Sequence, residues 1–178
     1  MARSLIERAV KRAGTGVLAG MSQQDQYHLL YDWASWARPE QLPPPGDWLT
    51  WLVQAGRGWG KSRTGAEWIR GRVETQGARR IALVGRTPSD VRDTMVEGES
   101  GILACCPENN RPTYKASIRR LTWSNGAMAL TFTSYEPDQL RGPQFDTIWW
   151  DELAAFQYLR ETWENGQLAL RLGPHPRQ

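Results

Sequence analysis

One short segment of the sequence carries residues whose types and spacing could bind phosphate. A small residue is followed by four residues of any type and then by Gly-Lys-Ser, at Ala55, Gly56, Arg57, Gly58, Trp59, Gly60, Lys61 and Ser62. Glycines let the backbone curl until its N–H groups face an anion. The lysine ammonium then meets the β- and γ-phosphates, and the serine hydroxyl ligates Mg²⁺. These residues are therefore predicted to bind Mg-ATP.

A second segment places two carboxylates at the end of an apolar stretch. Residues 147–150 are Thr-Ile-Trp-Trp, and Asp151 and Glu152 follow directly. In a phosphate-loop ATPase one carboxylate holds Mg²⁺, and the other orients and deprotonates the attacking water. We assign Asp151 to the metal together with Ser62, and Glu152 to the water. The alternative is an acidic pair at the surface end of an ordinary strand.

Two arginines could add positive charge to this chemistry. Arg57 lies inside the loop, where it is either a second cation on the γ-phosphate or a plain surface arginine. Arg141 precedes the acidic strand in Gln-Leu-Arg-Gly-Pro. A cation there could stabilise transition-state charge in its own or a neighbouring subunit, or it could have no such role. Lys61, Arg57, Arg141 and Glu152 are thus the candidate catalytic residues.

Regular elements must hold these residues in place. Periodicity and capping residues predict helices over residues 22–37, 62–76, 88–96 and 161–172. Short apolar runs predict strands over residues 48–55, 80–85 and 147–150, and Ser-Asn-Gly between residues 119–123 and 127–134 predicts a β-hairpin. Alternating strands and helices predict an α/β fold with a mainly parallel central sheet flanked by helices.

Composition restricts the alternatives. Hydrophobic residues make up 40% and charged residues 23% of the 178 residues, as in a globular chain of about one domain. The net charge of +3 permits contact with nucleic acid without demanding it. The adjacent Cys105 and Cys106 and the isolated His28 and His175 argue against a disulfide framework and a zinc site. No apolar run is long enough to span a bilayer.

The N-terminal part differs from the remainder. Residues 1–37 are predicted to be a helical segment that begins with a short amphipathic helix over residues 1–14. A proline-rich stretch follows, with three consecutive prolines in an extended conformation. We therefore expect a phosphate-loop ATPase domain over residues 38–178.

Four stretches resemble the large terminase subunit of tailed bacteriophages and gene-transfer particles. They are residues 37–48, 55–68, 95–101, and 140–146 running into 150–153. The resemblance implies an ATPase of the ASCE type that uses Mg-ATP to drive DNA packaging into a procapsid, in the cytoplasm of a bacterial host. It implies double-stranded DNA, a portal protein and a small terminase subunit as partners, and a homo-oligomeric ring, with no membrane.

The resemblance also assigns roles to individual residues. Gln41 matches a glutamine that contacts adenine, and Arg57 matches an extra basic residue of the loop. Arg141 matches an arginine that acts across subunits.

Some features of the family have no match in the sequence. A threonine-rich coupling strand would begin near His175, and residues for a nuclease domain are absent, so we expect the sheet to lack its last core strand or strands. Two alternatives stay open. One is another phosphate-loop DNA motor, such as a helicase-like protein, and the other is a non-catalytic remnant that binds only nucleotide or a partner protein.

Overall fold

The computed structural model describes residues 20–178, so the helix predicted for residues 1–14 lies outside the described residues. The chain divides into two compact units, with the boundary between Leu42 and Pro43. No helix of the described part combines the length and apolar character that a bilayer span requires.

The described part of the first unit is helical. Helix α3 (Gln23–Tyr31) begins after Ser22, whose hydroxyl accepts the backbone N–H of Asp25 at 3.1 Å, as the capping pattern predicted. The single helix predicted over residues 22–37 is wrong in one respect. Asp32 leaves the helical conformation with a ψ of 85°, and the chain continues as the short helix α4 (Trp33–Trp36) and the 3₁₀ turn η1 (Pro39–Gln41).

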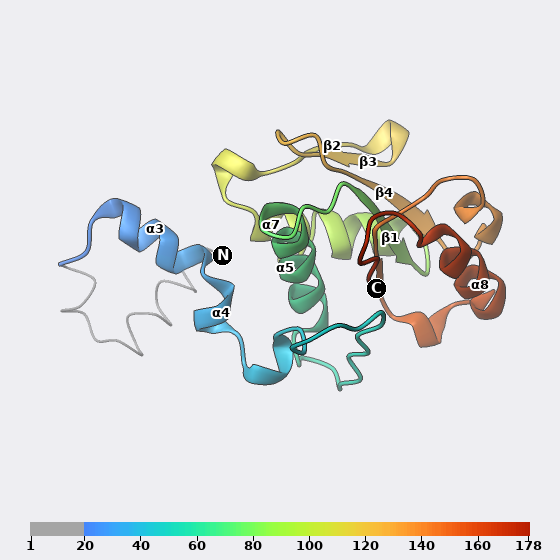
Figure 1. The fold of residues 1–178 in the computed structure, drawn as a ribbon, viewed down its shortest axis with the longest axis horizontal. Coiled ribbons are helices and arrows are strands. Elements are labelled where there is room, and N and C mark those ends of the chain that lie inside the picture. Colours follow the sequence, from blue (N-terminus) through green and yellow to red (C-terminus); the bar gives the residue numbers. More distant parts are fainter. Residues whose placement is uncertain (1–19) are drawn as a thin grey trace. The chain divides into compact units, whose positions relative to one another are not determined.

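A five-stranded sheet forms the centre of the second unit (Figure 1), with the strand order β2-β3-β4-β1-β5. The strands are β1 (Arg80–Gly85), β2 (Thr113–Lys115), β3 (Arg120–Thr122), β4 (Met128–Thr133) and β5 (Thr147–Trp150). Strands β4, β1 and β5 are parallel to one another, whereas β2, β3 and β4 pair in antiparallel fashion. The predicted α/β class and the added hairpin are confirmed.

One face of the sheet is covered by helices that follow the phosphate loop. They are α5 (Lys61–Glu74), the short helix α6 (Pro88–Asp90) with the π-helical turn η2 (Val91–Val96), and α7 (Ile102–Cys105). Ile69 of α5 packs in one fully buried cluster with Leu83 and Leu121, which alternate along their strands with residues of the other face. This packing places the N-terminus of α5 at the carboxyl ends of β1 and β5.

The opposite face is only partly covered. The 3₁₀ turns η5 (Pro137–Leu140) and η6 (Leu153–Ala155) and the helix α8 (Leu159–Ala169) belong to this side. Leu140 of η5 and Ala169 of α8 share a buried cluster with Val84 of β1 and Ile148 of β5. Over β2 and β3, residues 20–178 leave the same face accessible, and the side chains of Lys115 and Thr122 are exposed.

Residues 48–55, predicted as a buried strand, form no strand. The edge of β5 that faces them is paired with Arg177, whose N–H donates to the Asp146 carbonyl at 3.0 Å and whose carbonyl accepts the Ile148 N–H at 2.9 Å. A cavity of about 540 Å³ lies between residues 50–55 and the end of β5. Gln178 bridges the gap at one end only. Its N–H donates to the Leu49 carbonyl at 3.0 Å, and its own carbonyl accepts the Trp51 N–H at 2.9 Å.

Candidate functional site

The phosphate loop connects residues 50–55 to α5. Gly58 and Gly60 have φ values of 77° and 96°, a left-handed conformation that strains any residue with a side chain. Gly60 caps α5, and its carbonyl accepts the N–H of Thr64 at 2.9 Å. The helix therefore begins at Lys61, one residue before the predicted start, and its free N–H groups face the loop.

Lys61 connects the two motifs that the sequence singled out. Its Nζ donates to the carbonyl oxygens of Ala55 at 3.1 Å and Gly56 at 3.4 Å, and lies 3.5 Å from Oε1 of Glu152. The two side chains are 27% and 62% exposed, so the ion pair contributes little to stability. Its importance is positional, because it places the loop ammonium beside a carboxylate from the end of β5.

The two carboxylates after β5 lie in different environments. The N–H of Asp151 donates to the Val84 carbonyl at 2.9 Å, which continues the pairing with β1. Burial raises the pKa of Asp151 to about 6, and the negative charge of Glu152 acts in the same direction. Glu152 is exposed and adopts a left-handed backbone conformation with a φ of 53°, which is rare outside glycine. Strain of this kind is often found at functional sites.

Two cavities meet at Lys61 and Glu152. A cleft of about 500 Å³ is lined by both residues together with Arg57, Gly58, Gly60 and Ser62 of the loop. The second cavity, between residues 50–55 and the end of β5, is lined by Lys61, Glu152, Asp151 and Ala55. The structure thus brings most of the predicted loop and acidic residues to one place. Gly56 and Trp59 form a turn within the loop, with an N–H to carbonyl distance of 3.4 Å.

Arg141 is not brought into this group, and Gln41 lies in the other compact unit, so its place relative to the site is not described. Arg141 lines neither cavity; its Nε donates to Oδ1 of Asn165 at 3.0 Å and lies 3.1 Å from Asp138. Gln41 belongs to the first unit, where its Oε1 accepts the backbone N–H of Arg38 at 3.2 Å. The roles given to Arg141 and Gln41 stay predictions.

The opposite wall of the cleft is formed by residues without an assigned chemical role in the sequence. They are Asp93, Thr94, Gly98, Glu99 and Ser100. A Cβ at Gly98 would lie 2.5 Å from the Asp93 carbonyl oxygen, so the tight turn of this wall requires glycine. The glycines at positions 98 and 101 could have indicated a tight turn from the sequence. A local pattern does not show which other part of the chain such a turn will face.

A buried ion-pair network on α5 lies next to the phosphate loop. Arg63 lines the cleft, and its Nε donates to Oε1 of Glu67 at 2.9 Å. Glu67 also lies 3.2 Å from Arg70, which in turn donates to the carbonyl of Cys105 at 3.0 Å. Burial raises the pKa of Glu67, and the two arginines oppose that shift. The network ties α5 to α7 and holds Arg63 at the edge of the cleft.

Ser62 and Asp151 fit a divalent cation by the chemistry of their donor atoms. Hydroxyl and carboxylate oxygens are the ligands that Mg²⁺ prefers, and a buried carboxylate with a raised pKa is stabilised by a nearby cation. Residues 20–178 contain no group of three or more His, Cys, Asp or Glu side chains that could hold a metal. An ion here would take its remaining ligands from phosphates and water.

The fold and the loop together define a phosphate-loop NTPase fold of the ASCE type. Residues 52–178 match the family described as terminase large subunit, T4likevirus-type, N-terminal. The match covers well over half of the sequence, and the chain belongs to this family. No curated protein matches the sequence.

Two solved structures are similar to the chain. The large terminase of a thermophilic bacteriophage, in complex with ADP, aligns with a TM-score of 0.52 and 15% identity over 76% of this chain and 33% of that chain. The large terminase ATPase domain of Thermus phage P74-26 aligns with a TM-score of 0.46 and 15% identity over 67% of this chain and 55% of that chain. At this identity the first likeness shows the shared fold, and the chain spans about a third of that protein.

The raised pKa of Asp151 predicts that stability without nucleotide falls as the pH rises. The folded state retains the proton of this carboxyl up to about pH 6, whereas the unfolded chain releases it near the ordinary value of 3.8. The stabilising contribution of the protonated Asp151 carboxyl is therefore fully present below pH 3.8 and is lost as the pH rises to 6. This loss lowers the free energy of unfolding by about 3 kcal/mol. Asp151→Asn should flatten this dependence in urea unfolding between pH 4 and pH 8. Parallel pH profiles for the two proteins would contradict the assignment.

Proposed function

We propose that this chain binds and hydrolyses Mg-ATP as the motor part of a DNA-packaging terminase. The observation that carries the proposal is the 3.5 Å approach of Lys61 to Glu152, where the two cavities meet. It supports the two roles that hydrolysis needs, because a cation for the phosphates and a base for the water lie side by side. Membership of the terminase family supports DNA packaging as the process that uses the energy.

Each residue of the site has a defined task in this proposal. Lys61 exchanges its contacts with Ala55 and Gly56 for the β- and γ-phosphates, and the N–H groups at the start of α5 bind the same phosphates. Arg57, exposed at the cleft, adds a second cation. Glu152 orients the attacking water and accepts its proton.

The metal completes the charge balance. Ser62 and Asp151 would hold Mg²⁺, which when bound offsets the negative charge of the transferring phosphoryl group. The raised pKa of Asp151 is consistent with this task, since a cation beside the carboxylate favours its charged form.

The remaining parts of the proposal concern the assembled motor. Gln41 contacts adenine, and Arg141 acts on the site of a neighbouring subunit in a homo-oligomeric ring. A role outside its own cleft is supported by the position of Arg141, whose side chain is 68% exposed. The partners are double-stranded DNA, a portal protein and a small terminase subunit, and the process takes place in the cytoplasm of a bacterial host.

Nucleotide binding by the wild-type chain and by Lys61→Ala tests the first step. We expect the wild type to bind a fluorescent ATP analogue with Mg²⁺, and the variant to bind at least tenfold more weakly, because it loses a charge-assisted contact of roughly 1.5–3 kcal/mol. Arg160→Ala, which removes an exposed cation on α8, is the matched control and should bind like the wild type. Equal affinities for the wild type and a folded Lys61→Ala would refute the site.

A further inference from the structure

The open part of the sheet carries positive charge that the nucleotide site does not use. Residues 109–135 contain four basic residues and no acidic residue. Because the whole chain has 22 basic and 19 acidic residues, the remaining residues carry 18 and 19, a net charge of −1. Arg119 lies 3.6 Å from Glu136, directly after this segment, so three of its four basic residues form the local excess of positive charge. A local excess of this kind is the electrostatic signature of a surface that meets a polyanion.

The sheet register places two of these cations directly opposite each other on neighbouring strands. Lys115 of β2 and Arg120 of β3 are directly paired. Side chains in such pairs lie on the same face about 5 Å apart, and like charges there destabilise the sheet. Among the described residues, neither cation forms an ion pair or a side-chain hydrogen bond. An anion from outside the chain would supply the missing compensation.

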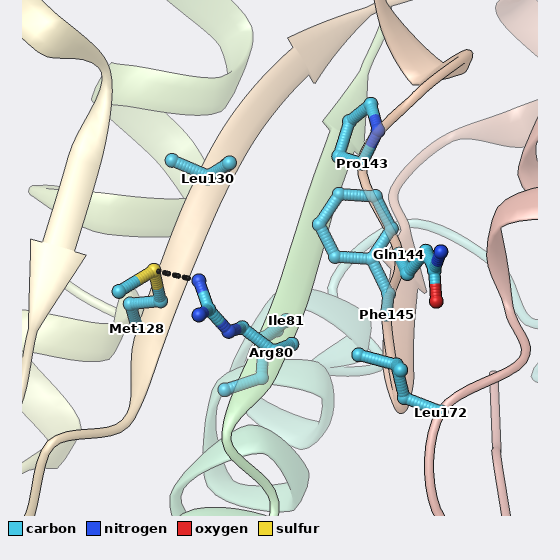
Figure 2. A pocket seen from close by; sticks show the side chains of 8 residues that line it. All are labelled: Arg80, Ile81, Met128, Leu130, Pro143, Gln144, Phe145 and Leu172. Atoms are coloured by element: carbon cyan, nitrogen blue, oxygen red, sulfur yellow. Dashed lines mark hydrogen bonds between the residues drawn. The ribbon is translucent and has the colours of Figure 1, made fainter.

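Arg80 extends the same face onto β1. Arg80 is paired with Met128 of β4, and Met128 is paired with Thr122 of β3. Paired residues share a face, and Thr122 lies two residues after Arg120 on the same strand. The side chains of Arg80, Met128 and Thr122 therefore lie on the same face of the sheet as Arg120. The Arg80 Nη1 contacts the Met128 sulfur at 2.8 Å, beside the apolar side chain of Leu130 (Figure 2). Sulfur is a weak acceptor, so most of the five guanidinium donors stay available.

The nearby carboxylate of Asp146 does not neutralise this arginine side chain by hydrogen bonding. Its Oδ2 accepts the backbone N–H groups of Arg79 and Arg80, at 2.7 and 2.9 Å. Arg80 and Lys115 lie three strands apart, about 14 Å across the sheet, and Lys115 is offset by a further two residues along its strand. The exposed hydroxyl of Thr122 lies on a strand between them. Cations and hydroxyls spread over such a distance suit a series of phosphates better than one compact anion.

We propose that Lys115, Arg120 and Arg80 form a basic sheet face that binds the phosphate backbone of double-stranded DNA without regard to sequence. The side chains of Met128 and Leu130, the apolar residues of this face, have no N–H or O–H groups that could recognise base edges. We therefore expect the binding to be independent of DNA sequence. The inference rests on the proposed function in its choice of DNA as the polymer, and it is independent of ATP hydrolysis.

Binding of a fluorescent mixed-sequence duplex to the full 178-residue chain, without nucleotide and over a series of salt concentrations, tests the inference. We expect Lys115→Gln/Arg120→Gln/Arg80→Gln to bind at least tenfold more weakly, and its slope of log affinity against log salt to fall by about 3. The control Arg86→Gln/Arg92→Gln/Arg160→Gln removes the same charge from exposed arginines on other elements and should keep most of the slope. Equal losses in the two triple variants would overturn the inference.

Lys115→Glu separates binding from a structural role. The new carboxylate would face Arg120 as an attractive pair, so we expect the midpoint of thermal unfolding to rise while DNA affinity falls. A variant that loses both stability and binding would overturn the proposal. Poly-glutamate at equal charge concentration is the competitor. If it displaced DNA, the proposal would also be overturned, and the face would be assigned to an acidic protein. A wild type that binds the ATP analogue but no DNA would refute the basic sheet face and leave the proposed nucleotide site intact.

Discussion

Replacement of Glu152 by glutamine is expected to lower Mg²⁺-dependent ATP turnover at least 100-fold and to leave ATP binding in place. A positioned general base typically contributes about 10²–10⁴-fold to the rate, and the amide cannot accept a proton from water. The amide keeps the size of the side chain and can still accept a hydrogen bond from Lys61, which now lies 3.5 Å from the carboxylate. Phosphate release and binding of a fluorescent ATP analogue, measured on the same samples, distinguish chemistry from binding.

Glu164→Gln is the matched control for this experiment. Glu164 lies on α8, where its carboxylate accepts a hydrogen bond from Arg160 at 2.8 Å, and it lines neither cavity. We expect this variant to turn over ATP like the wild type. Turnover by Glu152→Gln at the wild-type rate would remove Glu152 from its role as base. Binding without turnover in the wild type would contradict hydrolysis by this chain alone.

Addition of one methyl group at Gly65 is expected to destabilise the fold by about 1–3 kcal/mol. A Cβ at this position of α5 would lie 2.2 Å from Cε2 of Trp149, far inside van der Waals contact. Trp149 is 7% exposed and packed in the core on this face of the sheet, so the methyl group must displace the indole from this packing, toward the cavity that Gly65 and Trp149 both line. Because Asp151 follows two residues later, a displaced Trp149 should also weaken ATP turnover.

Gly71→Ala gives the control on the same helix. A Cβ at Gly71 would have no atom within 4 Å, so the alanine should stabilise α5 by roughly 0.5–1 kcal/mol. The two substitutions make the same chemical change and are expected to have opposite signs in urea unfolding. If Gly65→Ala proved as stable as Gly71→Ala, the close approach of α5 to Trp149 would be wrong.

Several features of the fold could be predicted from the sequence because local residues determine them. The strand bounds of 80–85 and 147–150 agree with β1 and β5, since each is an apolar run between turn residues. The turn at residues 124–126 has glycine at a φ of 85°, as a tight hairpin requires. The glycines of the phosphate loop act through their own backbone angles, so the loop and the helix after it were also predictable.

Other features depend on partners that are distant in the sequence. Residues 48–55 have the composition of a strand, but a strand needs a neighbouring backbone edge. The nearest edge of β5 is paired with Arg177, and within the described part of the chain residues 49–51 pair only with Gln178. Strand β2 is only three residues long, and pairing with β3 makes it a strand. The wall of the cleft at residues 93–100 could not be predicted, because no local pattern shows that it faces the phosphate loop.

The sequence by itself determined which residues could carry the chemistry, since a phosphate loop and an acidic strand end are local patterns of residue type and backbone freedom. Only the tertiary structure decided which of them meet. It placed Lys61 beside Glu152 and left Arg141 outside both cavities. It also set Lys115 opposite Arg120, because strand register is decided by packing across the whole sheet rather than by neighbours in the chain.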